Sequence, residues 1–358
     1  MEKKSYLVLE NGQVFEGKSF GAEGDVIGEI VFTTSMTGYV EALTDPSFFG
    51  QILVQTFPLI GNYGFNFDDF ESKAPHLKAY IVREWCQEPS NFRSEGNLDT
   101  FLKQEGIVGL YGIDTRQLTK IIREYGVMNA KIVSSRKNLA AILAELKNYS
   151  IQDAVKNTSS KEITSFNSEN GTKRVVLLDL GAKESIRKEL IKRGCEVVVV
   201  PSHTTSEEIL ALNPNGIMLS NGPGDPSENT EVITEIAKLL EANIPTFGIC
   251  LGHQLVALSQ GAKTIKLKYG HRGENQPVKD TITGSVYISS QNHGYAVDTS
   301  TLPKYAKERF INANDNTCEG IDYQGMPVFT VQFHPEASGG PRDTMFLFDR
   351  FITLMGGN

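Results

Sequence analysis

The stretch "PTFGICLGHQLVALSQ", residues 245–260, decides the fold of the second half of this chain. An apolar strand pattern ends at Gly248, Cys250 stands between this glycine and Gly252, and a helical pattern begins at once. A nucleophile elbow has this form, because a sharp strand-to-helix turn exposes the nucleophile while the glycines avoid side-chain collisions. The partial positive charge at the helix N-terminus would favour the reactive thiolate. The alternative is a buried cysteine at a tight turn, with no chemical role.

Strand and helix patterns alternate around this stretch. The apolar strand candidates include "RVVLLDLG", "CEVVVVP" and "GIMLSNGPGD", and segments such as "KESIRKELIKRG" between them have helical periodicity. This alternation is typical of a mostly parallel, open sheet that helices cover on both faces. In such sheets reactive groups lie at the carboxyl ends of strands, where Cys250, residues 221–225 and His334 all fall. We therefore expect these residues to share one crevice.

A second motif, "VFTVQFHPEAS", ends an apolar strand with His334 and Glu336. Residues two apart in an extended chain point the same way, so Glu336 can orient His334 and stabilise its imidazolium. If His334 exchanges protons with Cys250, the three residues supply the nucleophile, base and orienting acid of a catalytic triad. Taken alone, the motif is also explained by a core histidine followed by a surface glutamate.

A third motif, "LSNGPGDPSEN", is rich in glycine. Gly222 and Gly224 would let backbone N–H groups approach a ligand closely, and together with the N–H of Leu251 they could form an oxyanion hole. Turn formation is the alternative explanation, because Asn-Gly and Pro-Gly pairs make turns without any ligand.

The first half of the chain has a different pattern. Residues 1–150 contain short strands punctuated by Gly and Pro, with a hairpin expected at Asn11-Gly12 and a helix expected between Asp114 and Gly126. Residues 151–171 are rich in Ser, Thr and Asn, as expected of a linker. The sequence thus predicts an α/β protein, with a β-rich first domain and a second domain, residues 172–358, built on the mostly parallel sheet.

Composition excludes several classes of protein. The 358 residues, 40% hydrophobic and 22% charged, are enough for two domain cores. The net charge of -8 comes from interspersed acids, which argues against a nucleic-acid partner. No apolar stretch is long enough to span a membrane and no signal peptide is apparent, so we expect a cytoplasmic protein. The four cysteines are scattered without a CxxC pair and are expected to be free thiols.

Together, "GICLGHQ", "SNGPGDP" and "FHPE" resemble the class I (triad) glutamine amidotransferase domain in order and spacing across residues 172–358. In the first half, "FTTSMTGYVEALTDPSFFGQILVQTFPLIGNYG", residues 32–64, and "GLYGIDTRQLTKIIREYG" resemble the first domain of carbamoyl phosphate synthetase small subunits. The resemblance implies that Cys250 attacks the carboxamide carbon of glutamine and that His334, oriented by Glu336, protonates the leaving ammonia. Water would then hydrolyse the glutamyl thioester.

The same resemblance implies a set of glutamine contacts: Ser47, Gly222, Gly224, Leu251, Gln254, Asn292, Gly294 and Tyr295. Gln254 lies one helical turn beyond Cys250 and can face the same ligand. Asn292 and backbone groups near it could recognise the amino-acid end of glutamine. Ser47 must reach in from the first domain, and its alternative role is to complete the turn "TDPS". Tyr295 occupies a position where the family often has Phe.

The expected partners follow from what the chain lacks. It contains no G-x-x-x-x-G-K-[ST] loop and no other apparent phosphate cradle, so we expect it to bind no ATP and to hold no cofactor. The resemblance implies a large synthetase subunit that binds ATP and Mg²⁺, receives the ammonia and makes carbamoyl phosphate from bicarbonate. L-Glutamine and this large subunit are the expected partners, and nucleic acid and membranes are not. The sequence does not distinguish arginine from pyrimidine biosynthesis.

Other functions fit the sequence less well. A metal site would combine Cys250 and His253 with one of three further histidines: His271, His293 or His334. No second ligand pair stands at zinc-like spacing, so no metal is expected. A non-catalytic scaffold subunit would be marked by the loss of a triad residue, and all are present. Another cysteine hydrolase, such as a peptidase, would need neither "SNGPGDP" nor the first domain. The glutaminase component of a different class I amidotransferase would lack that first domain.

Overall fold

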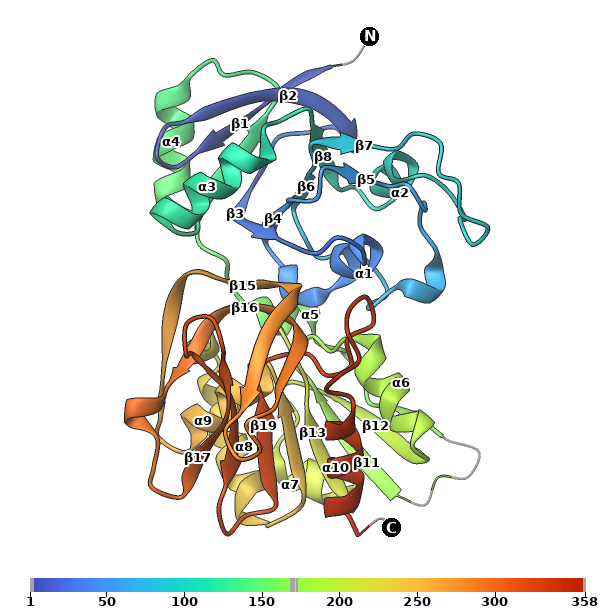
Figure 1. The fold of residues 1–358 in the computed structure, drawn as a ribbon, viewed down its shortest axis with the longest axis vertical. Coiled ribbons are helices and arrows are strands. Elements are labelled where there is room, and N and C mark those ends of the chain that lie inside the picture. Colours follow the sequence, from blue (N-terminus) through green and yellow to red (C-terminus); the bar gives the residue numbers. More distant parts are fainter. Residues whose placement is uncertain (1–2, 168–170, 172, 357–358) are drawn as a thin grey trace. The chain divides into compact units, whose positions relative to one another are not determined.

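The computed structural model of the chain describes residues 3–167, 171 and 173–356. The chain forms two compact units, Met1–Gln152 and Asp153–Asn358 (Figure 1). The stretch 151–171, expected to be a linker, contains the helix α5 (Ala154–Thr158) and the strand β10 (Thr164–Phe166). Because β10 pairs with a strand of the second unit, most of this stretch is part of that unit's fold. Residues 168–170 of the expected linker, and residue 172 where the second domain was expected to begin, lie outside the described residues.

The first unit is built around a closed barrel, which gives the expected β-rich domain its form. In their order around the barrel its strands are β1 (Lys4–Leu9), β2 (Val14–Gly21), β8 (Val108–Tyr111), β6 (Ala79–Ile81), β4 (Gln51–Gln55), β3 (Val26–Thr33) and β9 (Met128–Val133). The expected hairpin is confirmed: β1 and β2 are antiparallel neighbours, and Gly12 turns between them with φ 87°. Pairing of β1 with β9 closes the barrel and leaves none of these strands as a free edge.

Short helices and a two-stranded sheet complete the first unit. They are α1 (Tyr39–Thr44), α2 (Leu98–Gln104), α3 (Thr115–Tyr125), α4 (Leu139–Asn148), the 3₁₀ turns η1 (Pro46–Phe48) and η2 (Phe67–Asp69), and the strands β5 (Leu59–Ile60) and β7 (Glu84–Trp85). Helix α3 confirms its expected caps, because the Asp114 side chain accepts from the N–H of Gln117 at 2.9 Å and the helix ends at Gly126. Its apolar face, including Leu118 and Ile122, is buried.

The second unit contains a single ten-stranded sheet. Its strands are, in order across the sheet, β10, β12 (Cys195–Pro201), β11 (Lys173–Asp179), β13 (Gly216–Leu219), β14 (Thr246–Ile249), β19 (Val328–Val331), β18 (Cys318–Tyr323), β17 (Ala306–Asn312), β15 (Lys263–Asp280) and β16 (Val286–Asp298). The strands from β12 to β19 are parallel, as expected, and they form the part of the sheet that carries the candidate site. The strands on either side of this parallel part pair antiparallel.

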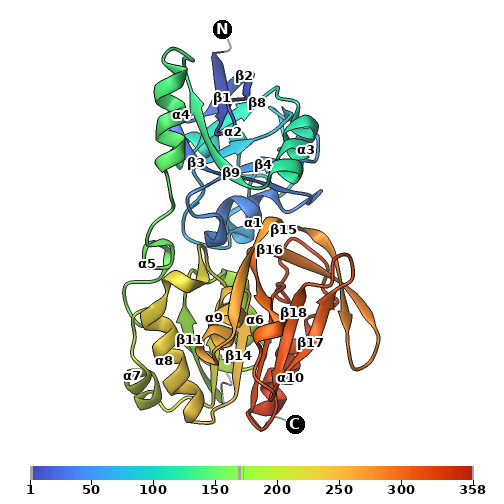
Figure 2. The same ribbon diagram turned by 90° about the vertical axis from the view of Figure 1, so that its left-hand side faces the viewer.

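Helices cover both faces of this sheet, as the strand–helix alternation predicts (Figure 2). They are α5, α6 (Glu184–Lys192), α7 (Ser206–Ala211), α8 (Thr230–Glu241), α9 (Leu251–Ser259), α10 (Phe346–Leu354) and the 3₁₀ turns η3 (Pro226–Glu228) and η4 (Thr299–Thr301). Helices α7, α8 and α9 contribute to one buried core, which includes Leu178 and Leu255. Helices α6 and α10 contribute to the other, which includes Phe247 and Phe348. The expected fold class is therefore confirmed.

Among the described residues, every helix is too short or too polar to cross a lipid bilayer.

Candidate active site

Four neighbouring parallel strands end at the candidate site. The chain that follows β11, β13, β14 and β19 carries Lys183, Asn221, Cys250 and His334, respectively. Because these strands are adjacent and run in the same direction, their carboxyl ends meet at one edge of the sheet, where open α/β sheets bind ligands. The second unit thus places the residues of all three sequence motifs at this edge.

Cys250 has the strained backbone of a nucleophile elbow. It follows β14 and caps α9, with φ 52° and ψ -101°, a conformation that costs an L-residue about 1–3 kcal/mol. Two backbone hydrogen bonds hold the turn: the N–H of Cys250 donates to the carbonyl of Val331 at 2.8 Å, and the N–H of Gly252 donates to Ser220 at 3.0 Å. Backbone strain that the surrounding structure holds in place is typical of functional sites.

The glycines of the elbow are required by close backbone approach. A Cβ atom at Gly252 would lie 2.4 Å from the carbonyl oxygen of Leu219 on β13. A Cβ atom at Gly222 would lie 2.2 Å from the carbonyl oxygen of Leu180 and 2.7 Å from a methyl group of Leu251. Gly222 and Leu251, which the sequence predicts to share an oxyanion hole, are therefore neighbours.

His334, Glu336 and Lys183 form a buried chain of charged groups. Nδ1 of His334 lies 2.6 Å from Oε1 of Glu336, and Nζ of Lys183 lies 3.1 Å from the same oxygen. All three residues are buried. The bond between Nδ1 and Glu336 fixes the orientation of the imidazole and leaves Nε2 as the nitrogen that can exchange protons.

The charges of this chain set its protonation. Burial favours a neutral His334, but Glu336 and the thiol of Cys250 outweigh it and raise the pKa of His334 to about 10. Burial also favours a neutral Glu336, but Lys183 and His334 outweigh it and lower the pKa of the carboxyl to about 2. Nε2 of His334 is buried without a hydrogen bond to any described residue. The arrangement can therefore hold a protonated imidazole and deliver its proton to a leaving group.

The strand β16 brings further expected residues to the elbow. The thiol of Cys250 donates to the backbone carbonyl of Asn292 at 3.7 Å. Nε2 of Gln254 donates to the backbone carbonyl of Tyr295 at 2.9 Å, so the helix that begins at the nucleophile is tied to the same strand. Gly294 lies between these residues on β16. Asn292 thus contacts Cys250, and Gln254 contacts Tyr295 on the same strand; their roles in glutamine binding stay predictions.

Two further expected glutamine contacts, Gly224 and Ser47, have local contacts of their own. A Cβ atom at Gly224, where φ is 89°, would lie 2.9 Å from the side chain of Ala154 on α5. Ser47 belongs to the first unit, in η1, and its N–H donates to the Asp45 side chain at 2.9 Å, which is the turn role that the sequence leaves open. The glutamine contacts of Gly224 and Ser47 stay predictions.

Sequence reasoning missed Lys183. This residue stands in the loop after β11 and directly before α6, where a lysine is usually solvated, yet its side chain is only 10% exposed. Its backbone N–H donates to Oδ1 of Asn221, at the start of the glycine-rich motif. One feature of the sequence could have identified Lys183. Like the three motifs, it follows an apolar strand.

His253, by contrast, has a structural environment. Nδ1 of His253 lies 2.8 Å from the hydroxyl of Thr330, and burial lowers the pKa of His253 to about 3. The ring is therefore neutral at physiological pH and links α9 to β19. The Thr330 contact is the packing role that the sequence gives as the alternative for His253.

Comparison with known proteins matches both halves of the chain to protein families. The family described as "Carbamoyl-phosphate synthase small chain, CPSase domain" matches residues 7–132, and "Glutamine amidotransferase class-I" matches residues 176–354. A carbamoyl phosphate synthase small chain of Fusobacterium nucleatum is 53% identical over 354 residues, which cover 98% of each chain. That of Archaeoglobus fulgidus is 52% identical over 98% of this chain and 99% of its own. A carbamoyl phosphate synthase pyrimidine-specific small chain of Bacillus subtilis is 51% identical over 98% of this chain and 96% of its own.

Proposed function

The chain belongs to the family of carbamoyl phosphate synthase small chains, and we propose that it is the subunit that hydrolyses L-glutamine to supply such an enzyme with ammonia. The strained Cys250 beside the buried pair of His334 and Glu336 is the observation that carries this proposal. The strand β16, with Asn292 and Tyr295, is the surface proposed to recognise the amino-acid end of glutamine.

The proposed reaction uses only groups of this chain. The thiolate of Cys250 attacks the carboxamide carbon of glutamine, and the backbone N–H groups of Leu251 and the Gly222 loop stabilise the oxyanion that forms. Nε2 of His334 gives its proton to the nitrogen of the departing amide, so the C–N bond breaks and ammonia leaves a glutamyl thioester. His334 then takes a proton from water, whose oxygen attacks the thioester, and glutamate and the thiolate are released. No cofactor of this chain is needed for these steps.

The proposal assigns the ammonia-consuming chemistry to a second polypeptide. A large subunit would bind ATP and Mg²⁺ and would make carbamoyl phosphate from bicarbonate and the ammonia that this chain delivers. A cytoplasmic location and the absence of ATP binding in this chain stay predictions from the sequence. One relative is named pyrimidine-specific and others simply small chains, so both arginine and pyrimidine biosynthesis remain open as the destination.

Covalent labelling tests the glutamine site. The purified chain, with and without the large subunit, is incubated with an electrophilic glutamine analogue and the adduct is mapped by peptide mass spectrometry. We expect one adduct, on Cys250, which excess L-glutamine suppresses but L-asparagine does not.

The other cysteines are the internal controls for this experiment. Cys195 and Cys318 are buried, and burial raises the pKa of Cys195 to about 11 and that of Cys318 still further, so neither should react. Labelling of Cys86, Cys195 or Cys318 that glutamine does not affect, or no adduct at all with the large subunit present, would overturn the proposed glutaminase function.

A further inference from the structure

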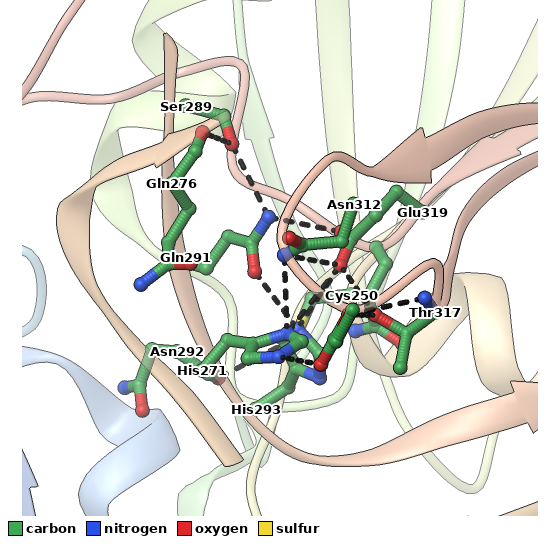
Figure 3. Close-up of polar contacts among 12 residues, drawn as sticks. Cys250, His271, Gln276, Ser289, Gln291, Asn292, His293, Asn312, Thr317 and Glu319 are labelled. Atoms are coloured by element: carbon green, nitrogen blue, oxygen red, sulfur yellow. Dashed lines mark hydrogen bonds and ion pairs between the residues drawn. The ribbon is translucent and has the colours of Figure 1, made fainter. Parts of the chain in front are cut away.

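A second cluster of chemically active side chains lies next to the candidate active site. It comprises His271 on β15, His293 on β16 and Glu319 on β18, and Figure 3 shows these side chains converging. One ligand atom of each lies within 4.8 Å of the other two, and the three side chains are buried, with Glu319 0% exposed. The proposed glutamine hydrolysis uses none of them.

The two imidazoles are held by their outward nitrogens. Nε2 of His271 lies 2.8 Å from Oδ2 of Asp315, and Nδ1 of His293 lies 2.7 Å from the backbone carbonyl of Tyr295. Both partners can only accept a hydrogen bond, so the outward nitrogen of each ring carries a proton. In a neutral imidazole the other nitrogen then presents a lone pair, and here Nδ1 of His271 and Nε2 of His293 both point into the cluster.

The inward nitrogens meet further lone pairs. Oε1 of Glu319 lies 3.5 Å from Nδ1 of His271 and 3.9 Å from Nε2 of His293. Oε1 of Gln291 lies 3.2 Å from Nε2 of His293, and the Gln291 amide is oriented by its NH₂ group, which donates to Glu319 at 3.0 Å. Buried acceptors that face one another without a proton or cation between them repel in a medium of low dielectric constant.

Asn312 supplies the donor that lies near both His271 and Oε1 of Glu319, and the hydroxyl of Thr317 lies 3.4 Å from the same oxygen. The NH₂ nitrogen of Asn312 lies 3.5 Å from Nδ1 of His271 and 3.4 Å from Oε1 of Glu319, both longer than a strong N–H hydrogen bond. Two imidazole nitrogens and one carboxylate oxygen thus converge in a buried cluster, which is a donor set that transition-metal ions take.

We propose that His271, His293 and Glu319 form a binding site for a divalent transition-metal ion such as Zn²⁺, with Nδ1, Nε2 and Oε1 as the respective ligands. Zinc takes imidazole nitrogen and carboxylate oxygen at about 2.0–2.2 Å, which puts neighbouring ligand atoms of a tetrahedral site about 3.4 Å apart. The separations of 3.5 and 3.9 Å in the cluster are close to this value. Gln291 offers an amide oxygen at the same centre.

The partners of the outward nitrogens match those of known metal sites. Ligating histidines usually donate their second N–H to a carboxylate or a backbone carbonyl, which fixes the tautomer and the ring direction. Asp315 does this for His271 and the Tyr295 carbonyl does it for His293. The proposed site uses neither Cys250 nor His253, so it differs from the metal site that the sequence excludes. It also revises the expectation that the chain holds no metal.

The metal ion would tie together three strands of the antiparallel part of the sheet. One of them, β16, also carries Asn292 and Tyr295 beside Cys250, so the ion would have a structural role next to the glutamine-recognition strand. The alternative is that a proton shared between His271 and Glu319 occupies the cluster instead of a metal ion. A measurement of metal binding distinguishes these two cases.

Direct metal binding by the full chain tests the proposal. The purified protein is freed of metal with a chelator, titrated with Zn²⁺ by isothermal calorimetry, and analysed for metal content after dialysis. We expect one Zn²⁺ per chain and a melting temperature that rises by about 5 °C or more when free Zn²⁺ is 100-fold above Kd. Co²⁺ should bind in its place and show the visible absorption of a site with nitrogen ligands.

The variants are chosen so that a folding defect does not imitate loss of the metal. Asp315→Asn changes a partly exposed side chain outside the ligand set and should weaken Zn²⁺ binding about 10–100-fold. Glu319→Gln removes a ligand and should weaken it further, and His203→Asn, at an exposed histidine, should leave it unchanged. The proposal fails if the wild-type chain binds no Zn²⁺, or if Asp315→Asn and Glu319→Gln bind it as tightly as the wild type does. Neither readout depends on glutamine hydrolysis, so this test and the labelling of Cys250 can fail independently.

Discussion

Lys183 and His334 share one oxygen atom of Glu336, which lies 3.1 Å from Nζ of the lysine and 2.6 Å from Nδ1 of the histidine. A buried carboxylate between two cationic groups stays ionised, because each of them offsets part of the cost of removing the charge from water. The ionised form is the one that holds the His334 imidazole in place. Lys183 therefore acts on the proposed base through Glu336, and is a positioning residue of the site.

Replacing Lys183 by Met tests this role. Loss of the ammonium removes an interaction that lowers the pKa of both Glu336 and His334, so both pKa values should rise. The limb of the kcat/KM profile that reports His334 should move to higher pH, and the unfolding free energy should fall by about 1–3 kcal/mol. Steady-state glutaminase assays between about pH 7 and 11 measure the shift. Lys183→Arg should retain most of the wild-type profile, and Lys192→Met, at a side chain that is 67% exposed, should leave it unchanged.

Replacing Cys250 by Ser should abolish glutamine hydrolysis. A hydroxyl is a far weaker nucleophile than a thiolate at neutral pH, and loss of a triad nucleophile lowers kcat by about 1000-fold or more. Glutamate release in the presence of the large subunit is the measurement. The matched control is Cys86→Ser in the first unit, and a similar loss of activity in both variants would contradict a specific role for Cys250.

Gly252→Ala should disrupt the elbow. The added methyl group would meet the carbonyl of Leu219 at 2.4 Å, so α9 must move away from β13 at a cost of about 1–3 kcal/mol. Because Cys250 begins the same helix, its labelling by the glutamine analogue should slow together with the loss of stability. Gly12→Ala, in a turn with open space around the glycine, should lower stability through its positive φ yet leave labelling of Cys250 unchanged.

The stability of the chain should decrease between neutral and alkaline pH through His334. Its pKa is raised from an ordinary value of about 6.5 to about 10 in the fold. The folded state therefore binds this proton more tightly, and the stabilisation is complete below pH 6.5 and is lost as the pH approaches 10. Denaturant unfolding should show a slope of up to about 1.4 kcal/mol per pH unit in this range. Glu336→Gln should flatten the slope, and His203→Asn should not.

The parts of the site that the sequence predicts are those fixed by local geometry. The glycines around Cys250 determine the turn between the strand and the helix. A strand cannot turn into a helix this sharply when these positions carry larger side chains. His334 and Glu336 stand two apart just after β19 and contact one another as expected, although the chain turns at Glu336 and is not extended there. The cap at Asp114 and the turn at Gly12 are likewise local and are confirmed.

The features that the sequence does not predict depend on pairing between distant strands. Closure of the barrel requires β1 to pair with β9, and nothing near either strand specifies that partner. Lys183 faces Glu336 only because β11 and β19 lie in the same sheet with just two strands, β13 and β14, between them. His271, His293 and Glu319 come from three different strands, so their spacing along the chain has none of the regularity of a zinc motif.

Gly248 of β14 pairs with Thr330 of β19, which lies far along the chain. The active site therefore depends on a strand that is synthesised late. The strand before Cys250 pairs on one side with β19, whose Val331 accepts the hydrogen bond that holds the strained nucleophile. A nascent chain on the ribosome that has not yet been extended through residue 331 has the cysteine but neither this hydrogen bond nor His334. Domains fold as units during synthesis. A growing chain therefore lacks both the base and the hydrogen bond that holds the nucleophile, and the catalytic site is assembled only after residue 334 has been added.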